Sequence, residues 1–292
     1  MSPSVSDKSW QNTQRAATTE SSRLSAERDA ILIGVFDSGI GGLTVVRALR
    51  QDFPQHNILY FGDTARTPYG TKSPETVIQY AIQDAEFLIQ RGAQILVVGC
   101  NTASSVATDP LRARFDVPIF EVISPAVQLA VSQTKGRRVG IIGTRATINS
   151  GVYEQKIRAL RPDMKVYGVA CPLLVPLVEE GWLKKGETRR IVKKYLHPLK
   201  LKQIHVLILG CTHYPLLKEV IQAKIGRRVR IIDSSEALSR SVKDFLEHNS
   251  HIATGLRTEG TCEFYVSDVT DHFQKLARKI LKSVGKLEHI KL

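Results

Sequence analysis

Short apolar runs alternate with longer amphipathic stretches along most of the chain, a pattern typical of a parallel sheet covered by helices. Each apolar run predicts a strand, and each amphipathic stretch predicts a helix that leads to the next strand. The predicted pairs are Ile31–Phe36 with Gly42–Gln51, Asn57–Phe61 with Pro74–Arg91, and Ile95–Gly99 with Thr102–Phe115. Strand Pro118–Glu121 and a helix from Pro125 follow, and strands Arg138–Ile142 and Lys165–Ala170 flank a helix over Ser150–Leu160.

The second half continues the alternation, so the fold class expected for the whole chain is α/β. Predicted helices cover Pro172–Glu180 and Glu187–Leu196 and begin at Tyr214, Ser235 and Thr270. Predicted strands cover Val206–Leu209, Arg228–Ile232 and Phe264–Ser267.

Two of the predicted strands are near copies of one another. ILVVGCNT at residues 95–102 and VLILGCTH at residues 206–213 are apolar runs that end in Gly-Cys. Such a repeat predicts two pseudo-symmetric parallel-sheet domains with the active site in the cleft between them, although similar strand ends also arise by chance. We place the first domain at residues 30–124 plus 234–292 and the second at residues 125–233. Residues 1–29 are rich in Ser and Thr, lack a hydrophobic period, and are expected to form a disordered tail.

Composition limits the classes of protein to which the chain can belong. A hydrophobic content of 42% over 292 residues is enough for a substantial core. No apolar window approaches the roughly 18 residues of a membrane span, and the N-terminus lacks a secretory signal, so we expect a cytoplasmic protein with no membrane contact. The four cysteines have no paired spacing, which argues against both a disulfide framework and a metal site.

A net charge of +13 raises the question of a polyanionic partner. Lys and Arg residues are densest between residues 184 and 202: Lys184, Lys185, Arg189, Arg190, Lys193, Lys194, Lys200 and Lys202. Spacings of four would place many of them on one helix face. A solvated helix face is the simpler interpretation, because no nucleic-acid motif accompanies the cluster.

Cys100 and Cys211 carry the most specific chemistry. Each follows a predicted central strand, and open α/β sheets bind ligands beyond that end of their strands. A helix start nearby would favour the thiolate form, although a lone buried Cys is more often a small core residue. Two thiols in matched settings suggest an acid and a base of the same kind, as in a two-base racemase. Thr102 and Thr212 could donate hydrogen bonds to a substrate, and His213 could relay a proton or simply pack in its loop.

Two further loops follow predicted strands. Residues 36–42, FDSGIGG, could hold an anion on backbone amides, while Asp37 could equally cap a helix. Residues 63–70, DTARTPYG, contain Pro and Gly that indicate a rigid loop able to present Tyr69, or a purely structural turn.

Taken together, these segments resemble the glutamate racemase family, whose members use no cofactor. The resemblance covers residues 31–245 through VFDSGIGGLTV, GDTARTPYG, GCNTAS, ACPLLVPLVEEG, LGCTHYPLL and IDSSEAL, in the order of the family. It implies interconversion of L-glutamate and D-glutamate, supply of D-glutamate for peptidoglycan, no cofactor, no metal and a homodimer.

The resemblance also implies roles for individual residues. Cys100 and Cys211 would be the catalytic thiols, with Asp37 assisting Cys100, His213 assisting Cys211, and Glu179 orienting His213. The positions expected to bind the substrate are Ser38, Asp63, Tyr69, Gly70, Asn101, Thr102, Thr144, Thr147 and Thr212. Two alternatives stay open at this point: a sister racemase that acts on aspartate or another acidic amino acid, and a binding role in which the basic surface contacts DNA or a DNA enzyme.

Overall fold

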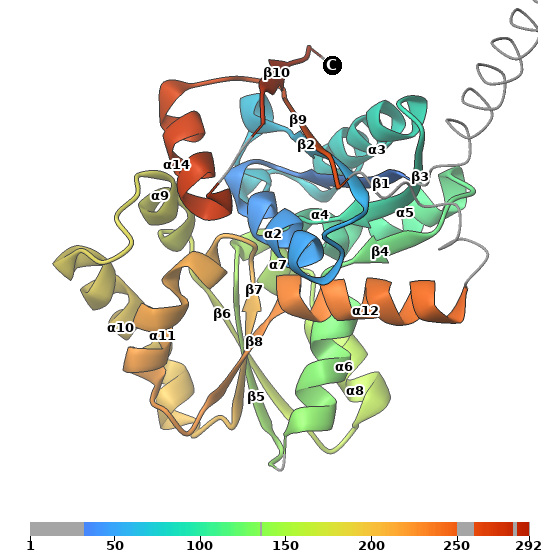
Figure 1. The fold of residues 1–292 in the computed structure, drawn as a ribbon. Coiled ribbons are helices and arrows are strands. Elements are labelled where there is room, and N and C mark those ends of the chain that lie inside the picture. Colours follow the sequence, from blue (N-terminus) through green and yellow to red (C-terminus); the bar gives the residue numbers. More distant parts are fainter. Residues whose placement is uncertain (1–31, 135, 250–259, 283–284, 292) are drawn as a thin grey trace, which may run out of the picture.

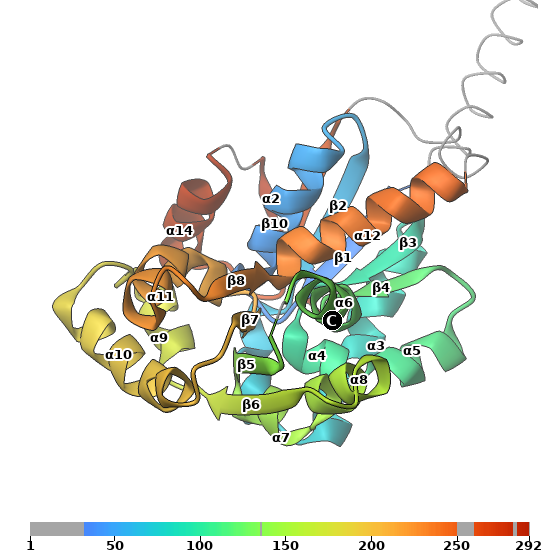
Figure 2. The ribbon, with the colours of Figure 1, turned by 90° about the horizontal axis from the view of Figure 1, so that it is seen from below.

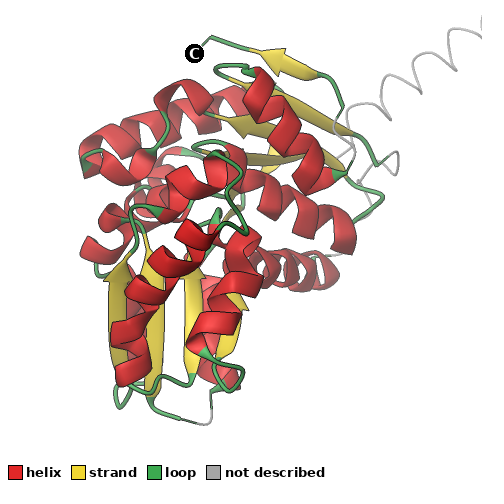
Figure 3. Cartoon of the chain, turned by 90° about the vertical axis from the view of Figure 1, so that its left-hand side faces the viewer, coloured by secondary structure: helices red, strands yellow, loops and turns green. Residues whose placement is uncertain are grey.

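The computed structural model describes residues 32–134, 136–249, 260–282 and 285–291, and these form two parallel sheets surrounded by helices (Figures 1 and 3). The predicted α/β class with two sheets is therefore confirmed. The expected N-terminal tail lies outside the described residues, and the domain boundaries given above stay a prediction. No helix of the described residues is long and apolar enough to cross a membrane.

The first sheet has six strands in the order β10-β9-β2-β1-β3-β4, and every neighbouring pair is parallel. The strands are β1 (Leu32–Asp37), β2 (Asn57–Gly62), β3 (Ala93–Val98), β4 (Ile119–Glu121), β9 (Cys262–Val266) and β10 (Leu287–His289). One face packs against α2 (Leu43–Asp52) and α14 (Asp271–Leu281). The other packs against α3 (Pro74–Gln90), α4 (Asn101–Val106) and α5 (Thr108–Arg114). We call this assembly the first lobe.

The second sheet has four parallel strands in the order β6-β5-β7-β8. The strands are β5 (Arg138–Gly143), β6 (Lys165–Ala170), β7 (Val206–Gly210) and β8 (Arg230–Asp233). Helices α9 (Leu174–Glu179), α10 (Gly186–Leu201) and α11 (Lys218–Ile225) pack against one face. The short helix α7 (Arg145–Asn149) follows β5. These elements form the second lobe.

The two lobes share one hydrophobic cluster. Helices α6 (Ile123–Gln133), α8 (Val152–Leu160) and α12 (Ser234–His248) contribute to the same buried cluster as β1, α2 and β7. Helix α12 packs against both α2 and α6 (Figure 2). The buried apolar surface between the lobes stabilises their joint arrangement, and the cleft they enclose lies where β3 and β7 end.

Several predicted elements differ from the observed ones for local reasons. The helix predicted over 102–115 is two helices, because Pro110 has no N–H to continue the hydrogen-bond ladder across Ala107. The helix predicted over 150–160 is α8 alone, since Gly151 has a φ of 69° that separates it from α7. Helix α6 begins at Ile123 rather than Pro125. The segment after Tyr214 is a 3-10 helix (Tyr214–Leu217) before α11 begins.

Candidate active site

Both repeated cysteines line one small cavity between the lobes. Its volume is about 20 Å³, and its lining contains Ser38, Pro68, Tyr69, Gly70, Cys100, Asn101, Thr102, Thr144, Val175, Cys211, Thr212 and His213. Ten of the fourteen residues predicted from the sequence are in this set. The other four, Asp37, Asp63, Glu179 and Thr147, lie directly behind residues of the lining, as described below.

Cys100 follows β3 and occupies the position before α4, where its carbonyl accepts a hydrogen bond from Ser104 N at 2.8 Å. Its Sγ lies 3.8 Å from Ser38 Oγ, and the residue is only 5% exposed. Burial, together with the charge of Asp37, raises the pKa of the Cys100 thiol to about 12. Burial therefore opposes the thiolate form that the start of a helix would favour at this position.

Cys211 occupies the corresponding position after β7, and it has a different partner. Its Sγ lies 3.7 Å from His213 Nδ1, and His213 Nε2 lies 3.2 Å from Glu179 Oε1. Burial lowers the pKa of His213, but the hydrogen bonds and charges of Cys211 and Glu179 outweigh it and raise the pKa well above its usual value. A protonated imidazole favours a thiolate on its neighbour, so this side of the cavity suits a base.

Asp37 lies behind the cavity at the end of β1 and joins the lobes. Its Oδ1 accepts a hydrogen bond from Gly39 N at 2.8 Å, and its Oδ2 accepts one from Thr212 Oγ1 at 3.0 Å. Burial raises the pKa of Asp37, while the charge of His213 and these hydrogen bonds lower it. The charge of Asp37 raises the pKa of Cys100, and its role in assisting this thiol stays a prediction.

Tyr69 is held by a buried polar network that the sequence analysis found only in part. The Tyr69 hydroxyl contacts Asp63 Oδ2 and, at 2.9 Å, Asp84 Oδ2. Arg66 binds both carboxylates, and Ser267 donates a hydrogen bond to Asp63 Oδ1 at 2.8 Å. Burial and the charge of Asp63 raise the pKa of Asp84 well above its usual value. A protonated Asp84 would donate to Tyr69, which then donates to Asp63, so every oxygen in the network has a matching partner.

Hydroxyl and amide groups join the lobes beside Cys100. Thr102 of α4 hydrogen-bonds Thr144 at 3.0 Å and Thr147 at 3.3 Å across the cleft. Asn101 Nδ2 donates to the Tyr153 hydroxyl at 2.9 Å. Among the described residues, the buried Asn101 Oδ1 has no hydrogen-bond partner. An acceptor on the cavity wall without a partner is suited to a cationic group of a ligand.

Glycine is required where the lobes approach most closely. A Cβ at Gly70 would lie 2.6 Å from Thr144 Cβ, and a Cβ at Gly41 would lie 2.4 Å from Thr212 Oγ1 and 2.5 Å from His213 Nδ1. All three distances are shorter than ordinary van der Waals contacts. The glycines of the two loops thus allow the second lobe to lie against the first.

Sequence reasoning missed Asp84 and Tyr153. Asp84 lies among Ala81, Ala85 and Leu88 on the buried face of α3, and an ionisable residue at an apolar helix position was a signal that could have found it. Tyr153 lies in the first turn of α8 and has no local pattern that indicates a role.

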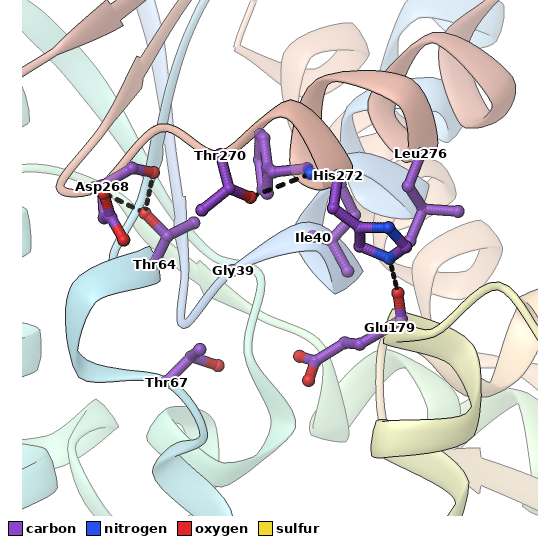
Figure 4. A pocket seen from close by; sticks show the side chains of 10 residues that line it. Gly39, Ile40, Thr64, Thr67, Glu179, Asp268, Thr270, His272 and Leu276 are labelled. Carbon is purple, nitrogen blue, oxygen red and sulfur yellow. Dashed lines mark hydrogen bonds between the residues drawn. The ribbon is translucent and has the colours of Figure 1, made fainter.

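A second cavity is larger. It has a volume of about 180 Å³ and lies between the Gly39–Ile40 loop, the end of α9 and the start of α14 (Figure 4). Glu179 lines this cavity, and the Nε2 atom of His272 contacts the Glu179 backbone carbonyl. Within the described residues, no group of three or more His, Cys, Asp or Glu side chains is placed to hold a metal ion.

The chain is similar to a family of known enzymes over most of its length. The model of the Asp/Glu/hydantoin racemase family matches residues 43–242. A glutamate racemase from Syntrophus aciditrophicus is 44% identical over 261 residues, which cover 89% of this chain and 96% of the relative.

Solved structures agree with the sequence comparison. The glutamate racemase isoform RacE1 from Bacillus anthracis superposes with a TM-score of 0.86 at 35% identity, covering 90% of this chain and 98% of that one. A glutamate racemase from Francisella tularensis in complex with D-glutamate gives a TM-score of 0.83 at 38% identity, with the same coverage.

Proposed function

The chain belongs to the Asp/Glu/hydantoin racemase family, and we propose that it interconverts L-glutamate and D-glutamate by moving the α-proton between two thiols. It is an isomerase. The observation that carries the two-thiol mechanism is that Cys100 and Cys211, each following a central strand of a different sheet, line the same cavity.

Each turnover exchanges one proton at the α-carbon. A thiolate on one side removes the α-proton and forms an S–H bond, while the electron pair stays on the carbon in a carbanion-like transition state. The thiol on the other side then gives its proton to the opposite face, which leaves a thiolate there and a product of opposite hand. In the reverse direction the two thiols exchange roles.

The two thiols have different electrostatic surroundings. Burial raises the pKa of Cys100, which suits this residue to act as the proton donor, and His213, whose pKa is raised, lies beside Cys211 on the opposite side of the cavity. Glu179 stabilises the imidazolium, and Asp37 acts on Cys100 through its charge. The ammonium group of glutamate brings a positive charge into the cavity, which favours the thiolate that each direction requires.

Polar groups of the lining would hold the substrate. Hydroxyls and backbone amides of Ser38, Gly70, Thr102, Thr144 and Thr212 are suited to the two carboxylates. Donors fixed before the reaction stabilise the charge that develops next to the α-carboxylate.

Other predicted binding residues act with less direct contact. Asn101 Oδ1 would accept from the ammonium group. The hydroxyl of Tyr69 is already bound by Asp63 and Asp84, so Tyr69 contributes to the cavity wall with its hydroxyl turned to these carboxylates. Asp63 supports Tyr69, and Thr147 supports Thr102, from behind the wall.

Substrate entry requires the lobes to move. A cavity of about 20 Å³ has room for about one water, which occupies about 10–15 Å³ on the same measure. Glutamate is several times larger. The hydrogen bond between Thr102 and Thr144 must therefore open for glutamate to enter, and closure afterwards excludes water.

The product and the thiols support a biological role and a cellular location for the reaction. D-glutamate is a building block of peptidoglycan, and we propose that supplying it is the role of this enzyme. All four cysteines are free, and two must remain reduced for activity, which supports a cytoplasmic location.

The proposal is tested by assaying purified protein and its Cys100→Ser and Cys211→Ser variants on both enantiomers of glutamate and of aspartate. We expect racemisation of glutamate by the native protein only, with unchanged circular dichroism in the variants. Robust turnover by either variant would contradict the two-thiol mechanism, and faster turnover of aspartate would favour the sister racemase.

We also propose two binding partners: a second copy of the chain and a polyanion. Exposed Leu173 and Trp182 flank α9, which supports a homodimer, and light scattering would test it. The Lys and Arg side chains of residues 184–202 are exposed along α10, and although two of them pair with Glu187 and Glu219, the net charge supports a polyanion as a second ligand. Salt-dependent retention on DNA that survives loss of both thiols would support the latter.

A further inference from the structure

A hydrogen bond joins the start of α14 in the first lobe to the end of α9 in the second. The Nε2 atom of His272 contacts the backbone carbonyl oxygen of Glu179 (Figure 4). A carbonyl oxygen only accepts, so Nε2 carries the proton and donates it. This contact lies outside the cavity that holds the thiols, and the mechanism above does not use it.

Helix α14 is a fixed support for this donor. Thr270 Oγ1 accepts a hydrogen bond from Phe273 N at 3.1 Å and closes the first turn. Phe273, Leu276 and Ala277 are buried, and α14 packs against α2 and the 3-10 helix Ile40–Gly42. The backbone that carries His272 is therefore fixed relative to the loop that begins with Asp37 and Ser38.

The Glu179 carbonyl is the part of the α9 end that needs a partner from elsewhere. The amides of Glu180, Gly181 and Trp182 donate to the carbonyls of Pro176, Val178 and Leu177, at 2.9, 2.9 and 2.8 Å. The next carbonyl along the chain is that of Glu179, and it accepts a hydrogen bond from His272. The cavity of about 180 Å³ lies beside this contact, so close packing does not hold the α9 end on that side.

Glu179 connects this contact to the chemistry. Its backbone is bound by His272, and its Oε1 lies 3.2 Å from His213 Nε2, which in turn places Nδ1 3.7 Å from Cys211 Sγ. A shift of the α9 end moves the carboxylate away from the imidazole. Because His272 belongs to the opposite lobe, opening the lobes would break the contact at the time when no proton transfer is needed.

We propose that His272 is a positioning residue for Cys211: it holds Glu179 from the opposite lobe, and so makes the acid–base strength of the Cys211 side depend on closure of the lobes. The inference rests on the two-thiol function proposed above. His272 is exposed, and the sequence around it does not indicate such a role.

Racemisation rates alone cannot test this role. The two enantiomers of glutamate have equal free energies, so any variant must lower kcat/KM equally in both directions. Elimination reports each thiol separately. When chloride replaces a hydrogen on the β-carbon, a thiolate removes the α-proton, the electron pair forms the Cα=Cβ bond and chloride leaves. The resulting enamine tautomerises to an imine, and water converts it to 2-oxoglutarate and ammonium.

The experiment compares elimination from both enantiomers of this chlorinated glutamate by His272→Ala, His272→Gln and, as a control from the same helix, Lys275→Ala. Cys211→Ser first identifies which enantiomer depends on Cys211. We expect His272→Ala to slow elimination from that enantiomer by about tenfold, less than the 10²- to 10⁴-fold effect of full acid–base assistance. The other enantiomer should react at the native rate. His272→Gln, which keeps a donor near the Nε2 position, should restore most of the loss, and Lys275→Ala should change neither rate.

Equal slowing of both enantiomers by His272→Ala would show a general structural effect and overturn the inference, and so would no slowing of either. The ratio of the two rates does not depend on how much of the variant folds. Failure of the proposed function looks different, because the native protein would then neither racemise glutamate nor eliminate chloride.

Discussion

Gly41→Ala tests whether the active site depends on close contact between the lobes. The added Cβ would lie 2.4 Å from Thr212 Oγ1 and 2.5 Å and 2.8 Å from His213 Nδ1 and Cε1, where ordinary contacts are 3.4 Å or more. The second lobe or these two side chains must therefore move by about 1 Å. Both are parts of the proposed machinery, since Thr212 binds Asp37 and His213 contacts Cys211.

The magnitude follows from that displacement. A misplacement of about 1 Å costs about 100-fold in rate, or about 2.7 kcal/mol of activation free energy. Overpacking of a buried site costs a further 1–3 kcal/mol, roughly, in the free energy of unfolding. We expect a folded protein with a modestly lower Tm and a kcat for glutamate racemisation reduced by about two orders of magnitude.

The matched control is Gly186→Ala in α10. A Cβ there meets only Arg190 Nη1, at 3.8 Å, and the backbone is helical, so this variant should keep native activity and gain slightly in stability. Circular dichroism, thermal unfolding and a coupled racemisation assay measure both variants. A Gly41→Ala protein with native kcat and native Tm would refute the close approach of the lobes on which the site is built.

Two predictions concern pH, and one concerns the lobe contact. Burial raises the pKa of Asp84, so the native protein loses stability as pH rises above about 4 and through the raised folded-state pKa. Asp84→Asn should therefore gain stability relative to the native protein as pH rises above about 4, as measured by Tm, and a difference that stays constant with pH would contradict a protonated Asp84. The raised pKa of His213 stabilises the fold fully below about pH 6.5, and this stabilisation is lost as pH rises through the folded-state pKa. The Tm of Glu179→Gln should therefore lie furthest below the native Tm near pH 6.5 and approach it at higher pH. A Tm difference that grows with pH would contradict the stabilising role of the protonated His213. Tyr153→Phe removes the hydroxyl that accepts the hydrogen bond from Asn101 Nδ2. It should lower the free energy of unfolding, measured in urea, by roughly 1–3 kcal/mol, and should raise KM more than it lowers kcat. Native stability of this variant would show that the hydrogen bond does not hold the lobes together.

The sequence predicted the sheets well because buried parallel strands have a strong apolar signal. Predicted strands at Asn57–Phe61 and Val206–Leu209 match β2 and β7 to within one residue. Strand β10 was missed, since Leu287–His289 has only three residues and no alternation that could indicate it. Helix boundaries failed where one side chain decides them. Glu121, for example, accepts hydrogen bonds from the amides of Ile123 and Ser124, and so begins α6 before Pro125.

The residues of the site, like the elements of the fold, could be predicted from the sequence only in part. Residues of the strand-end loops were predicted because their motifs are long and occur in the order of a known family. Asp84 and His272 were not, because their partners lie far away in sequence and only the fold brings them together. The chemistry at Cys100 also depended on the fold: the helix start was visible in the sequence, but the burial that raises its pKa was not.

The most direct test of the two-thiol mechanism follows native protein on L-glutamate, and separately on D-glutamate, in deuterated water at low conversion. We expect the α-carbon of every newly formed product molecule to carry deuterium, because its hydrogen comes from the second thiol, which exchanges with solvent. Remaining substrate should still carry protium. Product that retains the substrate's own hydrogen would mean that a single group removes and returns the proton, and would contradict a reaction between Cys100 and Cys211.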